Sequence, residues 1–227
     1  MIKKLLVAVV VLVAVVVGGL YLVAGNLPKI VRSEIETQGS RALGVGVRVR
    51  GAELQQADSP EPMIRLTGLT VANPQGFVGD NAITIDEVWI RYDGRPNQPG
   101  GRIVVREVIA SGIVVAFVGE SGANNLETLQ RSAIAAARES ATRRDQETPK
   151  LLVDSFGSRP GRLQITHRAL PNSVTVTMPP VGTGSIGRRE NGATAAEVAQ
   201  RLLGAIVVEA VRSVITEVQN ALSTKPK

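Results

Sequence analysis

Apolar and polar residues alternate along the first half of this chain, and the alternation breaks in the same way each time. In each copy the pattern positions are i, i+2, i+5 and i+7, so one residue lies inside each pair and two residues separate the pairs. The copies are Val47-x-Val49-x-x-Ala52-x-Leu54, Ile64-x-Leu66-x-x-Leu69-x-Val71, Ile83-x-Ile85-x-x-Val88-x-Ile90 and Ile103-x-Val105-x-x-Val108-x-Ala110. A later fifth copy, Leu151-x-Val153-x-x-Phe156-x-Ser158, ends on a polar residue. Alternation puts every second side chain on one face of a strand, and the extra residue is typical of a β-bulge or sharp bend.

The first four copies begin 17, 19 and 20 residues apart, and turn-forming clusters separate them at 56–60, 73–81 and 93–101. This regularity predicts a curled antiparallel sheet with one apolar face, in an α+β fold. Further strands are expected at 113–117, 151–153, 163–165 and 174–178. The residues expected to line the apolar face as a groove are Ile64, Leu66, Ile83, Ile85, Val88, Ile90, Ile103, Val105 and Val108. The alternative is that the same residues form a closed core.

Two helices are predicted beside the strands. One spans 28–43, with Pro28 in its first turn and Gly44 after its end. The other spans about 126–143, and Asn124 or Asn125 can cap it. Both have a partial apolar stripe, which predicts packing against the sheet.

The C-terminal segment predicts a longer helix. Thr194 and Glu197 have the spacing of a capping box, and apolar residues follow on one wide face. Representative positions on that face are Val198, Leu202, Ile206, Val211, Val214 and Val218. This helix is expected either to pack along the apolar face of the sheet or to occlude the groove and bind a partner. Charges recur every few residues, which argues against a membrane span.

Residues 5–24 form an uncharged apolar stretch. As a helix it reaches about 30 Å, the thickness of a bilayer core. Lys3 and Lys4 precede it, which predicts a single-pass inner-membrane anchor with a cytoplasmic N-terminus and an exported body. A cleavable signal peptide ending near Val23-Ala24-Gly25 is the alternative.

The composition excludes several classes of site. The 227 residues include no cysteine and one histidine, so a thiolate site or a multi-histidine metal centre is excluded. The net charge of +6 is thinly spread, and aromatic residues make up only 3%. No basic patch with interleaved aromatics is present, so nucleic-acid binding is not expected.

No catalytic constellation is visible, so the chain is expected to be neither an enzyme nor a cofactor or metal protein. Asp86 and Glu87 are adjacent, which favours a surface or bulge role over acid–base catalysis. Gly119-Glu-Ser-Gly122 lacks the spacing of a nucleophile elbow. His167 is expected to be an exposed residue at a strand end.

Several segments resemble the AsmA-like bacterial envelope proteins. They are Arg41-Ala-Leu-Gly-Val45, Leu66-Thr-Gly-Leu-Thr-Val71-Ala-Asn-Pro-Gln-Gly-Phe77, the 83–90 strand, Asn125-Leu-Glu-Thr-Leu129, Met178-Pro-Pro-Val181 with Ile186-Gly187, and Gly192-Ala-Thr-Ala-Ala-Glu197. The resemblance implies a short member of that family, with a repeating β-groove and a role in phospholipid movement between bacterial membranes.

The expected organisation is an anchor (1–25), a juxtamembrane helix (26–44), a repeated-strand groove (45–118), a helical insertion with a polar linker (119–149), further strands (150–190) and a long helix with its tail (191–227). The expected function is periplasmic lipid binding or transfer. The expected partners are the inner membrane through residues 5–24, a phospholipid, and a second copy or another envelope protein. The alternative is an anchored scaffold that has a closed core and binds no lipid.

Overall fold

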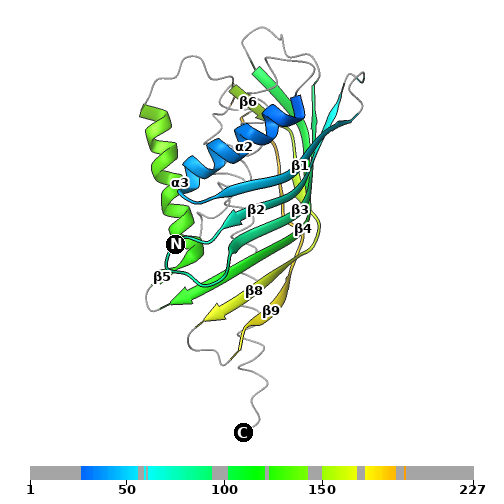
Figure 1. Ribbon diagram of the computed structural model, residues 1–227. Helices are drawn as coiled ribbons and strands as arrows, with labels where there is room; N and C mark the ends of the chain where they lie inside the picture. The colour runs from blue at the N-terminus through cyan, green and yellow to red at the C-terminus, as the bar shows by residue number, and fades with distance from the viewer. Residues whose placement is uncertain are drawn as a thin grey trace.

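The described part of the protein is built around one large mixed β-sheet with two helices beside it (Figure 1). The computed structural model describes residues 27–55, 59, 61–93, 102–120, 123–142, 150–167, 172–187 and 192. Among these residues the sheet stays open, with β1 at one edge and β9 and β10 at the other. The predicted anchor and the predicted C-terminal helix lie outside the described residues.

The first four strands form the antiparallel array that the pattern predicts. They are β1 (Val47–Gln55), β2 (Met63–Ala72), β3 (Asn81–Tyr92) and β4 (Arg102–Glu120), each paired with the next. The prediction of separate strands on either side of Ser111 and Gly112 is wrong, because β4 is continuous through them. Gly112 has a φ of 66° and stays in register with its neighbour, so the chain changes direction there without leaving the sheet.

The later strands correct the prediction of a purely antiparallel sheet. After β5 (Ala123–Asn124) and α3 (Asn125–Thr142), strands β6 (Lys150–Val153), β7 (Phe156–Ser158) and β8 (Gly161–His167) all run parallel to β4. The physical reason is the crossover. The segment between β4 and β6 returns the chain to the starting end of β4, so the next strand enters in the same direction. Strands β9 (Val174–Met178) and β10 (Gly182–Thr183) then pair antiparallel with β8 and β7.

The repeated break in the pattern is a crease that crosses the sheet in register. Arg50, Gly68, Asp86 and Gly112 face one another on β1 to β4, each falling between flanking pairs whose register does not change. Of the two structures that the pattern left open, a β-bulge or a sharp bend, the unchanged register favours the bend. Every strand departs from alternation at the same point, so apolar residues on both sides of the crease stay on one face. True register shifts occur elsewhere, between Val71 and Ala72 and between Arg91 and Tyr92.

Glycines make room for the crease. Gly68 and Gly112 both have positive φ, of 59° and 66°. A Cβ on Gly112 would lie 2.1 Å from Asp86 Oδ2, and one on Gly68 would lie 2.9 Å from Arg50 Cβ. The two larger side chains therefore lie over the glycine of the neighbouring strand, and this close approach requires glycine.

Helix α2 (Leu27–Leu43) packs beside β1, at the position and with the end that the sequence predicts. Its last turn closes with Gly44 at a φ of 67°, whose amide donates to the Ser40 carbonyl at 2.9 Å. Val31 and Ile35 on its inner face are fully buried. Figure 1 shows α2 lying between β1 and α3.

Helix α3 packs against α2 and the end of β4. Asn124 caps it, because its Oδ1 accepts a hydrogen bond from the Glu127 amide at 2.7 Å. Asn125 is fully buried and has a different role. Its Oδ1 accepts the Val118 amide, and its Nδ2 donates to Asn73 Oδ1 and to the Ala116 carbonyl. This one side chain therefore joins α3, β4 and the β2–β3 turn.

Candidate functional site

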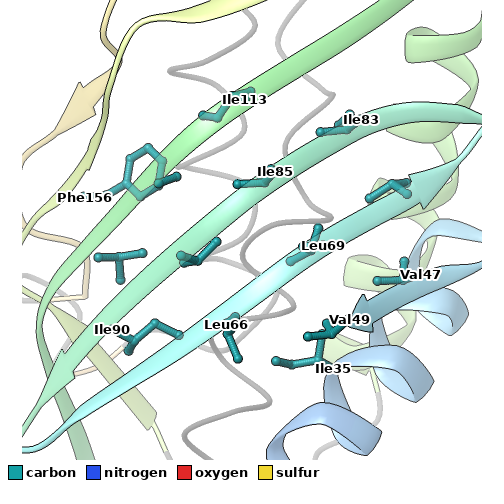
Figure 2. Packing of buried hydrophobic residues seen from close by; sticks show 14 of the residues in the cluster. Ile35, Val47, Val49, Leu66, Leu69, Ile83, Ile85, Ile90, Ile113 and Phe156 are labelled. Carbon is teal, nitrogen blue, oxygen red and sulfur yellow. The ribbon is translucent and has the colours of Figure 1, made fainter. Parts of the chain in front are cut away.

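The nine predicted groove residues lie on β2, β3 and β4. Ile103 is placed in β4, but its side chain is outside the described residues. The other eight side chains are at most 4% exposed and belong to one hydrophobic cluster. Figure 2 shows Leu66, Ile85 and Ile90 projecting from the same face of neighbouring strands. We call this surface the apolar face.

Strand register brings the predicted residues together as direct neighbours. Ile64 pairs with Ile90 and Leu66 with Val88 across β2 and β3. Val88 and Ile90 in turn pair with Ala110 and Val108 on β4. Such cross-strand pairs are the basic contacts of a packed sheet face. The eight described residues therefore share one face of the sheet, and their role as a lipid groove stays a prediction.

The apolar face is larger than the predicted set. It also includes the strand residues Val47, Val49, Leu69, Val71, Ala110, Ile113, Val115, Val153, Phe156 and Leu163. The helix residues Val31, Ile35, Leu43, Leu129 and Ala133 belong to the same hydrophobic cluster. The strand residues carry the same alternation as the predicted ones, so the sequence signal was present for them. Helix residues follow a different period, and only the fold shows that they reach the same cluster.

The chemistry of the apolar face is hydrocarbon contact. Its clustered residues are aliphatic, with Phe156 and Tyr92 as the aromatic members. The buried polar side chains among the described residues are Asp93, Asn125 and Gln130, which lie at the end of β3 and on α3 rather than along the strands. Such a surface can pack against an acyl chain or against other apolar side chains of the protein. Among the described residues of the cluster, the Tyr92 hydroxyl is the one titratable group, and burial raises its pKa.

The opposite face of the sheet carries a shallow hollow of about 320 Å³. Its lining residues are Met63, Glu87, Trp89, Arg91, Glu107, Ile109, Ser111 and Arg159. The Arg65 guanidinium lies 5.3 Å from the centre of the Trp89 ring, in a cation–π contact. Because Trp89 is the only tryptophan of the chain, its fluorescence reports on this face.

Several charged side chains in and beside the hollow form ion pairs with one another. Arg65 pairs with Glu87, whose Oε2 also accepts the Trp89 Nε1–H at 3.3 Å. Arg91 pairs with Glu107 at 3.1 Å. The hydrogen bond from Arg65 is the main cause that lowers the pKa of Glu87 below its ordinary value, and the hydrogen bond from Trp89 adds to it. The hydrogen bond to Glu87 in turn raises the pKa of Arg65.

A second charged cluster lies at the register shift between β3 and β4. Arg106 has no facing residue on β3 there, because Glu107 faces Arg91 and Val105 faces Tyr92. Its guanidinium reaches Asp154 Oδ2 at 3.0 Å and Asp93 Oδ2 at 3.3 Å. The contact with Asp154 is the main cause of the raised Arg106 pKa. This cluster ties β4 to the segment between β6 and β7 and is a structural feature.

The residues weighed for catalysis lie apart. Asp86 is exposed on the crease, whereas Glu87 pairs with Arg65 beside the hollow. His167 is the last residue of β8 and is exposed, as predicted. Within the described part of the chain, no group of three or more His, Cys, Asp or Glu side chains is placed to hold a metal ion.

Neither of the described helices, α2 and α3, is both long and apolar enough to cross a membrane. Comparison with known proteins leaves the family open: no protein-family model matches this chain, and no curated protein matches it in sequence.

Proposed function

We propose that this protein is a membrane-anchored periplasmic lipid-binding protein whose apolar face holds an acyl chain. The observation that carries the proposal is the continuity of that face. The crease keeps apolar residues on one side from β1 to β4, and the parallel strands β6 to β8 extend the same surface. The apolar N-terminal stretch and the resemblance to AsmA-like proteins support the same function.

The energetics favour a surface of this kind. Moving an acyl chain from a bilayer into water costs about 0.8 kcal/mol for each CH₂ group, so a 16-carbon chain costs roughly 13 kcal/mol. Contact with aliphatic side chains such as Ile85, Val88 and Val108 offsets that cost without any reaction. The role is therefore binding or transfer, with no catalytic step.

Burial favours a second candidate, the anchored scaffold with a closed core. The eight described groove residues are at most 4% exposed, so an acyl chain can reach them only in a conformation that uncovers the face. In the scaffold, that uncovering never happens and the contacts serve stability alone. The two candidates therefore differ in whether lipid touches the apolar face.

Photo-crosslinking in membranes tests this difference. A photoreactive phenylalanine analogue replaces Phe117 or Leu54, two half-buried residues packed against the apolar face in different strands. The matched control replaces Trp89, a half-buried aromatic residue on the opposite face. The full-length protein is irradiated in native membrane vesicles and analysed by mass spectrometry.

Lipid adducts at Phe117 and Leu54, with few at Trp89, are the expected result. Equal labelling at all three positions would show only contact with the bulk membrane. A folded protein with no adduct at Phe117 or Leu54 would overturn the lipid proposal and favour the scaffold.

A further inference from the structure

We propose that two copies of this chain join edge to edge through β9 and form one continuous sheet. The pairing follows from the geometry of the sheet edge and holds whether or not lipid binds. Pairing gives the two copies one longer apolar face, and only the use of that face for lipid rests on the proposed function. The partner is a second copy of the same chain, related by a twofold axis that passes between the two β9 strands.

Strand β9 is an exposed edge. Among the described strands it pairs only with β8, so alternate backbone N–H and C=O groups point away from the sheet. Ser173, Val174, Thr175 and Thr177 are all exposed. Val174, at 36% exposure, is one of the large apolar residues most open to solvent in the described chain.

At the opposite edge of the sheet, side chains of α2 cover the first half of β1. The Val47 amide donates to Ser40 Oγ at 2.9 Å and the Val49 amide to Glu36 Oε1 at 2.8 Å, so side chains of α2 take the place of a further strand. Arg32 on the same helix donates to the Arg50 carbonyl. Pairing of β9 with itself uses the same edge on both copies, so it closes at two copies and does not propagate into a fibre.

The sequence of β9 suits pairing with itself. Val-Thr-Val-Thr-Met carries no charge, and edge strands that avoid pairing commonly carry charges or proline within them. Prolines follow only after the strand ends, at 179 and 180. With the twofold axis at Val176, Thr175 faces Thr177 of the second copy, and threonine pairs of this kind stabilise antiparallel strands.

Pairing at β9 also completes the apolar face. Val176 pairs with Leu163 and Val174 with Ile165, so both valines lie on the same face as the buried side chains of β8. The apolar face therefore reaches the edge and is open to solvent at Val174. A second copy would cover this residue and continue the face with its own.

Cysteine crosslinking tests the pairing directly, because the chain contains no cysteine. Single cysteines are placed at 174, 175, 176 and 177 of the full-length protein in membrane vesicles, and disulfide formation is induced with a mild oxidant. Paired strands bring the α-carbons of facing residues to about 4.5–5.5 Å, within disulfide range. The control is Arg48→Cys, an exposed position on the edge strand β1.

The expected result is a crosslinked dimer that is strongest at Val176→Cys, the position on the twofold axis, and at least several-fold weaker for Arg48→Cys. Disulfide yields at all four positions no higher than the control would overturn the proposal. Lipid adducts at Phe117 are measured separately, so failure of the pairing and failure of lipid binding are distinguishable.

Introducing charges at Thr175 and Thr177 provides the second test. Thr175→Lys with Thr177→Lys, or Thr175→Glu with Thr177→Glu, places like charges opposite each other at the proposed axis, and each variant should lose most of its crosslink through Val176→Cys. Co-expression of the lysine and glutamate chains should restore it between unlike chains. Unchanged crosslinking of either variant alone, or no recovery in the mixture of folded chains, would contradict pairing through β9.

Discussion

The Val49 amide donates to Glu36 Oε1 at 2.8 Å, so a carboxylate of α2 takes the position at the β1 edge that a neighbouring strand would otherwise fill. The same Glu36 oxygen accepts from Arg32 Nε at 3.3 Å, which holds the carboxylate in place along the helix. A helix that satisfies strand amides in this way both stabilises the first strand and prevents it from pairing with another chain.

Replacing Glu36 with alanine should therefore destabilise the protein. The half-buried Val49 amide loses its acceptor, at a cost of about 1–3 kcal/mol, whereas Glu36→Gln keeps a carbonyl oxygen and should cost less. Urea unfolding of the full-length protein in detergent, followed by Trp89 fluorescence, measures the difference. Equal losses for the two variants would show that the acceptor oxygen is not what matters.

The crease predicts a severe effect of Gly112→Ala. The new methyl group would meet Asp86 Oδ2 at 2.1 Å and Asp86 Cβ at 2.6 Å, and the positive φ adds backbone strain. A loss of more than about 2 kcal/mol in unfolding free energy is expected. Gly76→Ala is the matched control, because Gly76 has a φ of 94° but nothing lies within 4 Å of its added Cβ.

A double-mutant cycle separates the clash from the strain. Asp86→Gly removes the side chain that Gly112→Ala would meet, so the double variant should be more stable than the sum of the two single losses predicts. Strictly additive losses would indicate that backbone strain alone explains Gly112→Ala and that the two residues do not meet.

The crease also shows how far the sequence could predict this fold. Alternation identified the first strands and the apolar residues of their shared face, because a two-residue period reports directly on which side chains face the core. It could not distinguish a bulge from an in-register bend. That difference depends on the neighbouring strand, where Gly68 and Gly112 face residues with larger side chains.

The parallel strands were beyond prediction from local pattern. Leu151, Val153 and Phe156 repeat the spacing of the earlier copies, and nothing in that spacing records strand direction. Direction is set by how the crossover through α3 returns the chain to β4, which is a long-range property. For the same reason the sequence did not reveal that Val105 and Val108 lie beside Val153 and Phe156.

Low pH should weaken the ion pair between Glu87 and Arg65 on the face of the sheet opposite the apolar face. Its folded pKa is lowered, so its interaction with Arg65 contributes stability above the unfolded pKa, near 4.5, and loses that contribution as the pH falls through the lower folded value. Trp89 emission should therefore change at a pH below about 4.5. Glu87→Gln should remove most of this transition, and a variant that titrates like the original protein would contradict the assignment.

Asn125 should be the most sensitive polar residue of the described chain. It is fully buried and makes four hydrogen bonds, with Oδ1 accepting from Val118 and Leu126 and Nδ2 donating to Asn73 and Ala116. Asn125→Asp replaces the two donors with an acceptor that faces two other oxygens, so a loss above about 3 kcal/mol is expected.

Asn124→Ala removes one capping bond at the same helix end and should cost only about 1 kcal/mol. Urea unfolding of both variants gives the comparison. Similar losses at the two positions would contradict the role of Asn125 as the link between α3, β4 and the β2–β3 turn.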